Sequence, residues 1–243
     1  MTGMLSLLLL GLLLGMRHAT DPDHVIAVTT IVARHKGSPG AAAIGAAWGV
    51  GHTVTILVMG GGIILSGWVI PPRVGLSMEF SVGLMLIVLG ILNLSGVRRR
   101  MARQPVEQAP AHRHEPGQRP LHWLDRQLGT FAMYQLLRPL VVGVVHGLAG
   151  SAAVALLVLT TIRNPAWALA YLLVFGLGTI VGMMLMTAVI ALPFTRAGSR
   201  GTRLSGGLRV ASGVMSLCFG LFVAYRTGVV DGLFTAHPAW TPR

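Results

Sequence analysis

The chain has 243 residues, of which 53% are hydrophobic and 11% are charged, and its formal net charge is +12. Several apolar runs reach or approach the ~20 residues that a membrane helix needs, so the composition excludes an ordinary soluble domain. The basic residues cluster in loops beside these runs, where they act as topology signals, and we therefore expect no nucleic-acid partner. The predicted fold class is an all-α polytopic membrane protein with six transmembrane helices in the lipid bilayer.

The first predicted span, residues 4–33, carries a dense group of polar side chains near its middle, at residues 17–24. This stretch holds an arginine, two histidines, two aspartates and a proline. A charged side chain at the bilayer centre costs roughly 3 to more than 10 kcal/mol, so such groups are functional by default. The alternative is a structural polar knot in which these side chains only satisfy one another between helices.

The spacing within this stretch places candidate metal ligands on one face. On an ideal helix, His18, Asp21 and His24 fall within a sector of about 120°, with Asp21 between the two imidazoles. Asp23 points away unless Pro22 bends the chain. Because Pro22 has no N–H, it also frees the carbonyl of His18. Imidazole, carboxylate and a freed carbonyl together indicate a divalent-cation site.

A second interpretation of the same stretch is enzymatic. His18 is followed five residues later by Asp23, and this spacing occurs in membrane glycerolipid acyltransferases, where the aspartate orients a histidine general base. The pair lies deep within a predicted span, and no soluble catalytic portion accompanies it. We keep the acyltransferase as an alternative.

The remaining predicted spans cover, in chain order, residues 41–70, 76–97, 140–161, 167–192 and 208–225. His52 follows Gly49 and Gly51, which thin the second span beside it, and it is a candidate partner for the first motif. His146 in the fourth span would complete the site from another helix. A lone histidine on an apolar helix is otherwise more often a packing residue.

The predicted spans form two related halves. The expected units are a first three-helix repeat (1–97), a basic His-containing cytoplasmic loop (98–138), a second three-helix repeat (139–225) and a short tail (226–243). Placing His18 on His146 also aligns Gly15 with Gly143. Gly49 and Gly51 likewise match Gly176 and Gly178, and Gly83 and Gly90 match Gly213 and Gly220. Because three is an odd number of spans, the second half is inverted, and inverted repeats are a transporter signature.

Basic residues concentrate in the loops at 34–40, 98–138 and 194–207. The positive-inside rule places these loops in the cytoplasm and both termini outside, in an inner or plasma membrane. The long loop carries His112, His114 and His122, which either collect metal ions or are ordinary solvated residues. It is also a candidate docking surface for a metallochaperone.

Residues 17–25 resemble the Arg-His-Ala-x-Asp-Ala-Asp-His-Ile signature of the nickel/cobalt transporter family, and Gly51-His52-Thr53 is similar to its Gly-His-Ser signature. The chain has six predicted spans where the family's permeases have eight, a proline in place of an alanine, and no counterpart of an acidic third signature. In these respects it resembles the compact branch of urease accessory, UreH-type membrane proteins. The resemblance implies that Ni²⁺ or Co²⁺ is recognised by His18, Asp21, Asp23, His24 and His52.

We therefore predict a transporter for a divalent transition metal, nickel first and cobalt second, and not an enzyme. The predicted metal ligands are His18, Asp21, Asp23, His24, His52 and His146. His18, Asp21 and His24 form the primary site, Asp23 orients them or adds a ligand, and the remaining two complete it. Ni²⁺ or Co²⁺ is the transported substrate, and no bound cofactor is expected. A further alternative is a non-transporting membrane partner for urease maturation that docks through the loop 98–138.

Overall fold

The computed structural model describes residues 2–33, 40–67, 70–101, 130–148, 162, 164–200 and 202–240. All regular secondary structure in these ranges is helical, which confirms the predicted all-α class. The elements are α1 (Thr2–His18), α2 (Pro22–Val32), α3 (Ala41–Ser66), α4 (Pro72–Met101), α6 (Thr130–Gly147), α8 (Pro165–Arg200), α9 (Thr202–Tyr225) and a π-helical turn, η2 (Arg226–Val230).

Four of the described helices are long and apolar enough to cross a membrane. The stretches are Ala41–Ser66, Pro72–Gly96, Pro165–Phe194 and Gly206–Val230, and shorter apolar helices cover Leu5–His18, Pro22–Val32 and Leu136–Gly147. Apolar side chains also face outward: on α8, Leu173, Leu177, Val181 and Leu185 recur every four residues and are all exposed. Such a stripe is suited to lipid rather than water. These features support a helical membrane protein.

The predicted first span, 4–33, is not one helix, because α1 ends at His18 and α2 begins at Pro22. Between them Asp21 has extended backbone angles (φ −60°, ψ 146°), and Pro22 occupies the start of α2, where its fixed φ favours a new helix. The prediction that the His18 carbonyl is freed was wrong. It accepts the backbone N–H of Asp21 at 3.1 Å, because the chain closes a turn there instead of continuing the helix.

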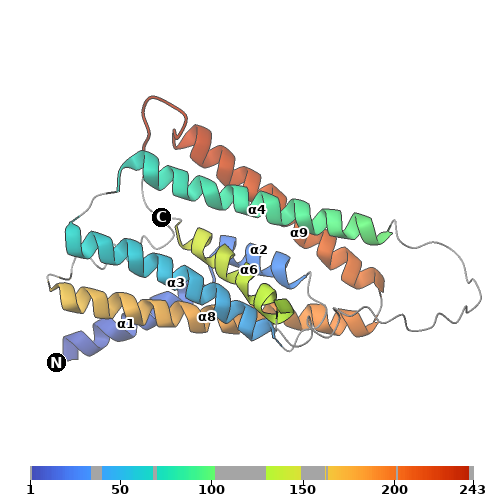
Figure 1. Ribbon diagram of the computed structural model, residues 1–243, viewed down its shortest axis with the longest axis horizontal. Coiled ribbons are helices and arrows are strands. Elements are labelled where there is room, and N and C mark those ends of the chain that lie inside the picture. Colours follow the sequence, from blue (N-terminus) through green and yellow to red (C-terminus); the bar gives the residue numbers. More distant parts are fainter. Residues whose placement is uncertain are drawn as a thin grey trace, which may run out of the picture.

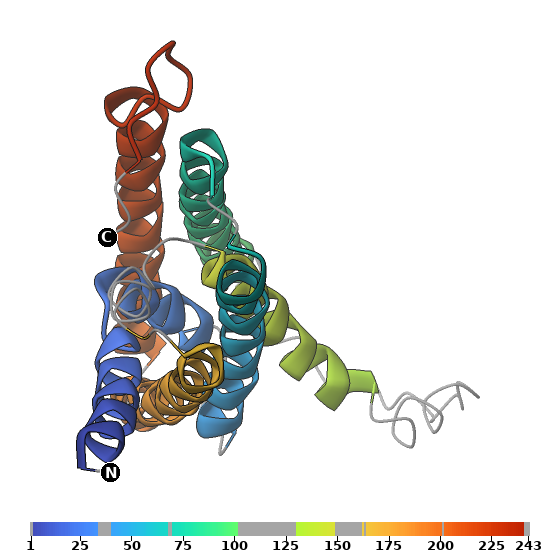
Figure 2. The ribbon, with the colours of Figure 1, turned by 90° about the vertical axis from the view of Figure 1, so that its left-hand side faces the viewer.

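The helices form a row and a separate pair (Figures 1 and 2). In the row, α8 packs between α1 and α3, and α3 packs between α8 and α6. The pair consists of α4 and α9, which lie along each other. The short helix α2 lies between the row and the pair, in contact with α8, α4 and α9. The interruption between α1 and α2 therefore lies in the interior of the protein, and both Ala19 and His24 are fully buried.

Glycines bring the helices of the row into backbone contact. A methyl group at Gly15 of α1 would collide with the carbonyl of Phe175 on α8, and one at Gly143 of α6 would collide with the carbonyl of Trp48 on α3. Further contacts of this kind in the row join Gly51 to Leu140 and Gly178 to Leu12, and in the α4–α9 pair they join Gly83 to Gly220 and Gly90 to Gly213. Small residues at helix crossings are typical of membrane proteins, where they allow backbones to approach closely.

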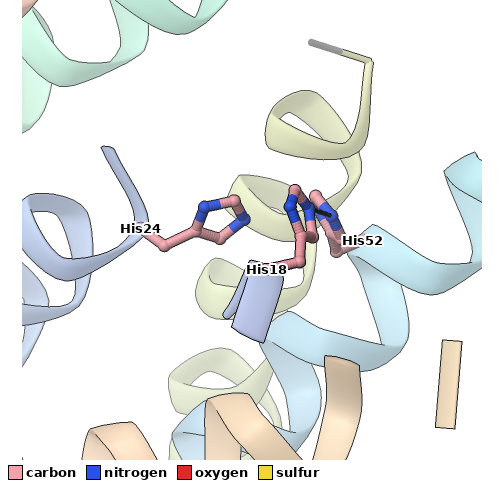
Figure 3. A group of neighbouring side chains, drawn as sticks. All are labelled: His18, His24 and His52. Carbon is pink, nitrogen blue, oxygen red and sulfur yellow. Dashed lines mark hydrogen bonds between the residues drawn. The ribbon is translucent and has the colours of Figure 1, made fainter. Parts of the chain in front are cut away.

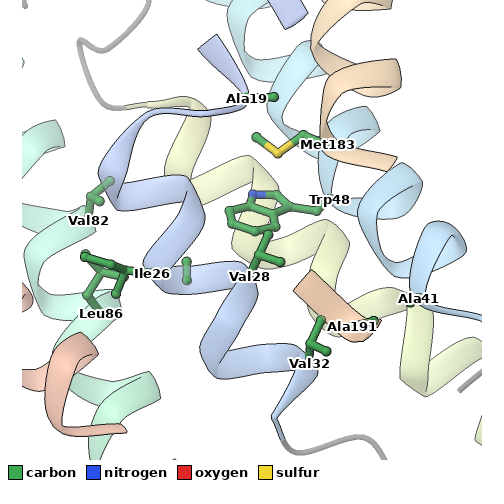
Figure 4. Close-up of a cluster of buried hydrophobic side chains, with 11 residues drawn as sticks. Ala19, Ile26, Val28, Val32, Ala41, Trp48, Val82, Leu86, Met183 and Ala191 are labelled. Atoms are coloured by element: carbon green, nitrogen blue, oxygen red, sulfur yellow. The ribbon is translucent and has the colours of Figure 1, made fainter. Parts of the chain in front are cut away.

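The main apolar cluster packs around α2 (Figure 4). Val28 of α2 joins Trp48 of α3 and Leu86 of α4 in this cluster, and all three are buried. A polar contact ties α2 to the pair as well, since the Thr30 hydroxyl donates to the carbonyl of Ser212 on α9 at 3.2 Å. These contacts fix the position of α2 relative to the neighbouring helices.

The helices extend into the predicted loop 98–138 from both sides. α4 continues to Met101 and α6 begins at Thr130, so both helices are longer than their apolar runs. Residues 102–129, and with them the histidines of the predicted loop, lie outside the described residues, as do residues 34–39 and 149–161.

The predicted tail, 226–243, is packed against α4 as far as residue 240. The indole N–H of Trp240 donates to the carboxylate of Glu79 at 2.9 Å. Phe234 meets Phe80 edge to face, with ring centroids 5.4 Å apart. The tail therefore covers the first turns of α4 rather than extending away from them.

Candidate metal centre

The six predicted ligands converge at the break between α1 and α2. His18 ends α1, Asp21, Asp23 and His24 lie at the start of α2, and His52 and His146 come from α3 and α6. All four histidines are buried, three of them completely. Figure 3 shows the rings of His18, His24 and His52 close together, with centroids 4.7, 5.0 and 5.1 Å apart. The side chains of four separate helical segments thus form one interior cluster.

His18, His24 and His52 form one group whose candidate ligand atoms all lie within 4.8 Å of one another. Nδ1 of His18 pairs with the Asp21 carboxylate at 2.8 Å, so Nε2 of His18 faces the group, where it meets Nε2 of His52 at 2.9 Å. Two ligands bound at about 2.1 Å and at right angles are about 3.0 Å apart. A cation could therefore lie between these two nitrogens with little rearrangement if the proton they share moves to Nδ1 of His52, which has no partner among the described residues.

Asp23, His24 and His146 form a second group, also within 4.8 Å. Nε2 of His146 donates to one oxygen of Asp23 at 2.9 Å. The other oxygen accepts from the backbone N–H of His24 at 3.0 Å and lies 3.1 Å from its Nδ1. The carboxylate of Asp23 is thus held between two imidazoles.

The two aspartates have exchanged the positions that an ideal helix predicts. Asp21 was expected between the imidazoles, but it contacts the outer nitrogen of His18, and its side chain is 37% exposed. Asp23 was expected to point away unless Pro22 bends the chain; the helix is interrupted before Pro22, and Asp23 lies between His24 and His146 with its side chain 19% exposed. The reason is the turn before Pro22, which ends the regular rotation of 100° per residue on which the prediction was based.

Several buried polar atoms of this cluster have no hydrogen-bond partner among the described residues. They are Nε2 of His24, Nδ1 of His52, Nδ1 of His146 and Nε1 of Trp48. More than 90% of buried polar groups in proteins are paired, so unpaired atoms gathered in one place call for an explanation. Neutral imidazole nitrogens are good ligands for transition metals. The donor set therefore fits a metal cation better than a self-satisfied polar knot.

Aromatic side chains enclose the cluster, and sequence reasoning assigned them no role. The Trp48 ring stacks on His24 at 5.8 Å and meets His146 edge to face at 5.6 Å. The Phe175 ring lies 5.6 Å from that of His18. Trp48 could have been found from its spacing, since it precedes His52 by four residues and so lies one turn away on the same helix face.

The acyltransferase dyad is not formed. His18 bonds to Asp21 and His52, whereas Asp23 bonds to His24 and His146. A general base and its orienting carboxylate need a direct hydrogen bond. The spacing of five residues does not produce that contact here, because the two residues lie on opposite sides of the helix break.

Residues 25–215 match the family model described as the cytochrome C biogenesis protein transmembrane region. The chain is also 37% identical over 231 residues to the urease accessory protein UreH of Bacillus sp. (strain TB-90), covering 95% of this chain and 96% of the relative. The chain belongs to the UreH family and to that transmembrane-region family. No solved structure matches it.

Membership of the UreH family confirms the resemblance found in the sequence. The UreH relative is named an accessory protein, and the matching model describes a transmembrane region. The chain is therefore a membrane protein and not an enzyme. The model match begins just after His24, so it includes His52 and His146 but not the first motif.

Proposed function

We propose that this chain transports a divalent transition-metal cation across the plasma membrane, with nickel as the first substrate and cobalt as the second. The buried cluster of four imidazoles and a carboxylate, placed where a membrane helix is broken, carries the proposal. Ionisable groups inside membrane helices are functional by default, and transporter sites typically lie on interrupted helices.

The donor atoms support this class of cation. Four of the six candidate ligands are imidazoles, which suit Ni²⁺, Co²⁺, Zn²⁺ and Cu²⁺, whereas Mg²⁺ and Ca²⁺ prefer oxygen. The similarity of residues 17–25 to the nickel/cobalt signature favours nickel and cobalt within that class. Zn²⁺ and Cu²⁺ would bind the same donors, so selectivity depends on the geometry imposed by the surrounding helices.

Each aspartate has a distinct role in the proposed site. Asp21 orients His18: by bonding to Nδ1 it fixes the ring so that Nε2 faces the cation, as carboxylates do for many metal-binding histidines. Asp23 supplies a negative charge between His24 and His146, which compensates the charge of a divalent cation in a poorly solvated interior. The imidazoles bind the cation only when deprotonated, so binding releases protons.

We further propose that the chain spans the membrane six times as two inverted three-helix repeats. The paired contacts of the glycines support this arrangement, because three of these contacts have counterparts in the other half. Gly15 on Phe175 corresponds to Gly143 on Trp48. In the same way Gly51 on Leu140 corresponds to Gly178 on Leu12, and Gly90 on Gly213 corresponds to Gly220 on Gly83. A two-fold relation between the halves accounts for all three pairs.

The proposed orientation follows from the basic loops. Positive-inside places the loops 34–40, 98–138 and 194–207 in the cytoplasm and both termini outside. In this orientation the loop 98–138 would receive a metallochaperone on the cytoplasmic side. Cysteine labelling of the two termini in intact cells tests the orientation, and a terminus that is inaccessible from outside would contradict it.

The proposed substrate is tested by calorimetric titration of the purified protein with Ni²⁺, Co²⁺, Zn²⁺ and Mg²⁺. We expect saturable binding of Ni²⁺ and Co²⁺, none of Mg²⁺, and loss of binding in the double variant His18→Ala/His24→Ala. His237→Ala is the matched control, because His237 is an exposed histidine in the tail. Uptake into proteoliposomes containing a metal-sensitive dye then tests transport. Binding that survives the double variant would contradict the proposed site.

A non-transporting partner of urease maturation is the second candidate, and the name of the UreH relative favours it. Such a partner would act through the loop 98–138 rather than through the helix break. Deleting residues 102–129 would then abolish urease activation in cells, while His24→Ala would leave it intact. The transporter predicts the reverse for His24→Ala, and added nickel in the medium should rescue that variant.

A further inference from the structure

We propose that the cluster is not one metal site but two adjoining positions that share His24, and that the transported cation passes between them. The first position consists of His18, His24 and His52, and the second of Asp23, His24 and His146. The inference rests on the proposed function and adds to it the path of the ion within the protein.

The two nitrogens of the His24 ring face different parts of the cluster. Nδ1 lies 3.1 Å from the Asp23 carboxylate, on the side of the second position. Nε2 is buried and has no hydrogen-bond partner within the described part of the chain. Figure 3 shows this ring directed toward His18 and His52. Since imidazole can bind a metal through either nitrogen, His24 can hold a cation on each side of its ring in turn.

The two positions otherwise draw on different helices. His18 and His52 come from α1 and α3, whereas His146 comes from α6 and Asp23 from α2. The orphaned nitrogens are distributed in the same way, with Nδ1 of His52 in one group and Nδ1 of His146 in the other. Each position therefore has its own ligands besides the shared one, and each can be removed separately.

The chemistry of the two positions differs as well. The first offers three imidazoles, with the Asp21 carboxylate behind His18. The second places a carboxylate directly among the ligands. Two divalent cations on opposite sides of one imidazole ring would repel each other strongly in this buried environment, so the positions are filled alternately. A cation that passes from one position to the other leaves one nitrogen of His24 and binds the other, and the ring proton moves to the nitrogen that the cation has left.

Variants with one substituted histidine distinguish two adjoining positions from one site. Co²⁺ is a suitable probe because its visible absorption depends on its ligands, and binding can be followed by titration of the purified protein. We expect one Co²⁺ per chain in the unmodified protein. His52→Ala should retain Co²⁺ at the carboxylate-containing position, and His146→Ala should retain it at the all-imidazole position. The two variants should therefore bind with different spectra, while His24→Ala should lose saturable binding.

Transport should respond differently from binding. In proteoliposomes we expect Co²⁺ uptake to fall at least tenfold in both His52→Ala and His146→Ala, although each still binds the ion, because each lacks one of the two positions. If the alanine variants do not fold, asparagine variants of the same residues can replace them, because the asparagine side chain fills part of the volume that the imidazole occupied. His237→Ala again serves as the control, and every variant is checked for a monodisperse profile.

Three outcomes decide the matter. If either single variant transports Co²⁺ like the unmodified protein, or if the two variants give identical spectra and affinities, there is one site and the proposal of two positions is wrong. The proposed transport function would not be affected by that result. If the unmodified protein does not bind Co²⁺ at all, the proposed function itself fails. Retained binding with distinct spectra and lost uptake supports the two positions.

Discussion

Changing each aspartate of the cluster to asparagine separates the two roles assigned to these carboxylates. Asp21→Asn keeps the shape of the side chain but removes the charge that holds Nδ1 of His18 at 2.8 Å. Outer partners of metal-bound histidines are worth about 10–100-fold in affinity. Because the Asp21 side chain is 37% exposed, solvent screens its charge, and we expect the lower end of that range, about tenfold.

Asp23→Asn should weaken metal binding much more than Asp21→Asn. The Asp23 carboxylate contacts His146 at 2.9 Å and Nδ1 of His24 at 3.1 Å, and its side chain is only 19% exposed. Carboxylate partners of metal-bound histidines are worth about 10–100-fold in affinity, and because Asp23 is the more buried of the two aspartates we expect the upper end of that range, about 100-fold. The variant also removes a charge that faces the cation.

The assay is Ni²⁺ titration by calorimetry at one pH and one ionic strength. Asp231→Asn is the matched control, because it makes the same acid-to-amide change in the tail segment. The expected order of affinity is unmodified protein and control, then Asp21→Asn, then Asp23→Asn. If Asp21→Asn weakens binding as much as Asp23→Asn, the structural distinction between an orienting and a coordinating carboxylate is wrong.

Other predictions follow from the packing and the ligand chemistry. Gly51→Leu should place a side chain against the backbone of Leu140, separate α3 from α6 and lower the thermal midpoint, whereas Gly62→Ala, with no neighbouring atoms within 4 Å, should leave it unchanged or raise it. Trp48→Ala should remove the ring stacked on His24 and weaken Ni²⁺ binding, and Trp48→Phe should restore most of the affinity, as measured by titration. Ni²⁺ affinity should fall as pH is lowered, since protonated imidazoles cannot bind, and calorimetry in buffers of different ionisation enthalpy should detect the released protons.

The location of the candidate site could be predicted from the sequence, because polar groups that are energetically costly inside a membrane helix can be recognised there. Charged and imidazole groups at residues 17–24 interrupt an apolar run, and nothing in membrane packing requires so many of them. The geometry within the stretch could not be predicted from helical periodicity, because the periodicity ends at the turn before Pro22. The sequence Asp21-Pro22 is a typical helix start, and it could have been recognised as one.

The contacts between distant segments are a different matter. His52 could be proposed as a partner from its glycine neighbours, but the hydrogen bond between its Nε2 and that of His18 depends on how α1 and α3 pack around α8. The pairing of His146 with Asp23 depends on the turn and on the α3–α6 contact together. Neither is encoded in local spacing, so the division into two groups became visible only in three dimensions.

The proposed repeat is symmetric in its packing but not in its chemistry, and the charge of the cargo explains why. Aligning His18 with His146 places Ala149 and Ser151 opposite the two aspartates of the first half. Two carboxylates and one divalent cation sum to zero charge, whereas carboxylates in both halves would leave the loaded cluster doubly negative. An uncompensated charge in a poorly solvated interior is costly, while a neutral assembly of cation and ligands is much less so. One half therefore supplies the charge, and the other needs to add only an imidazole.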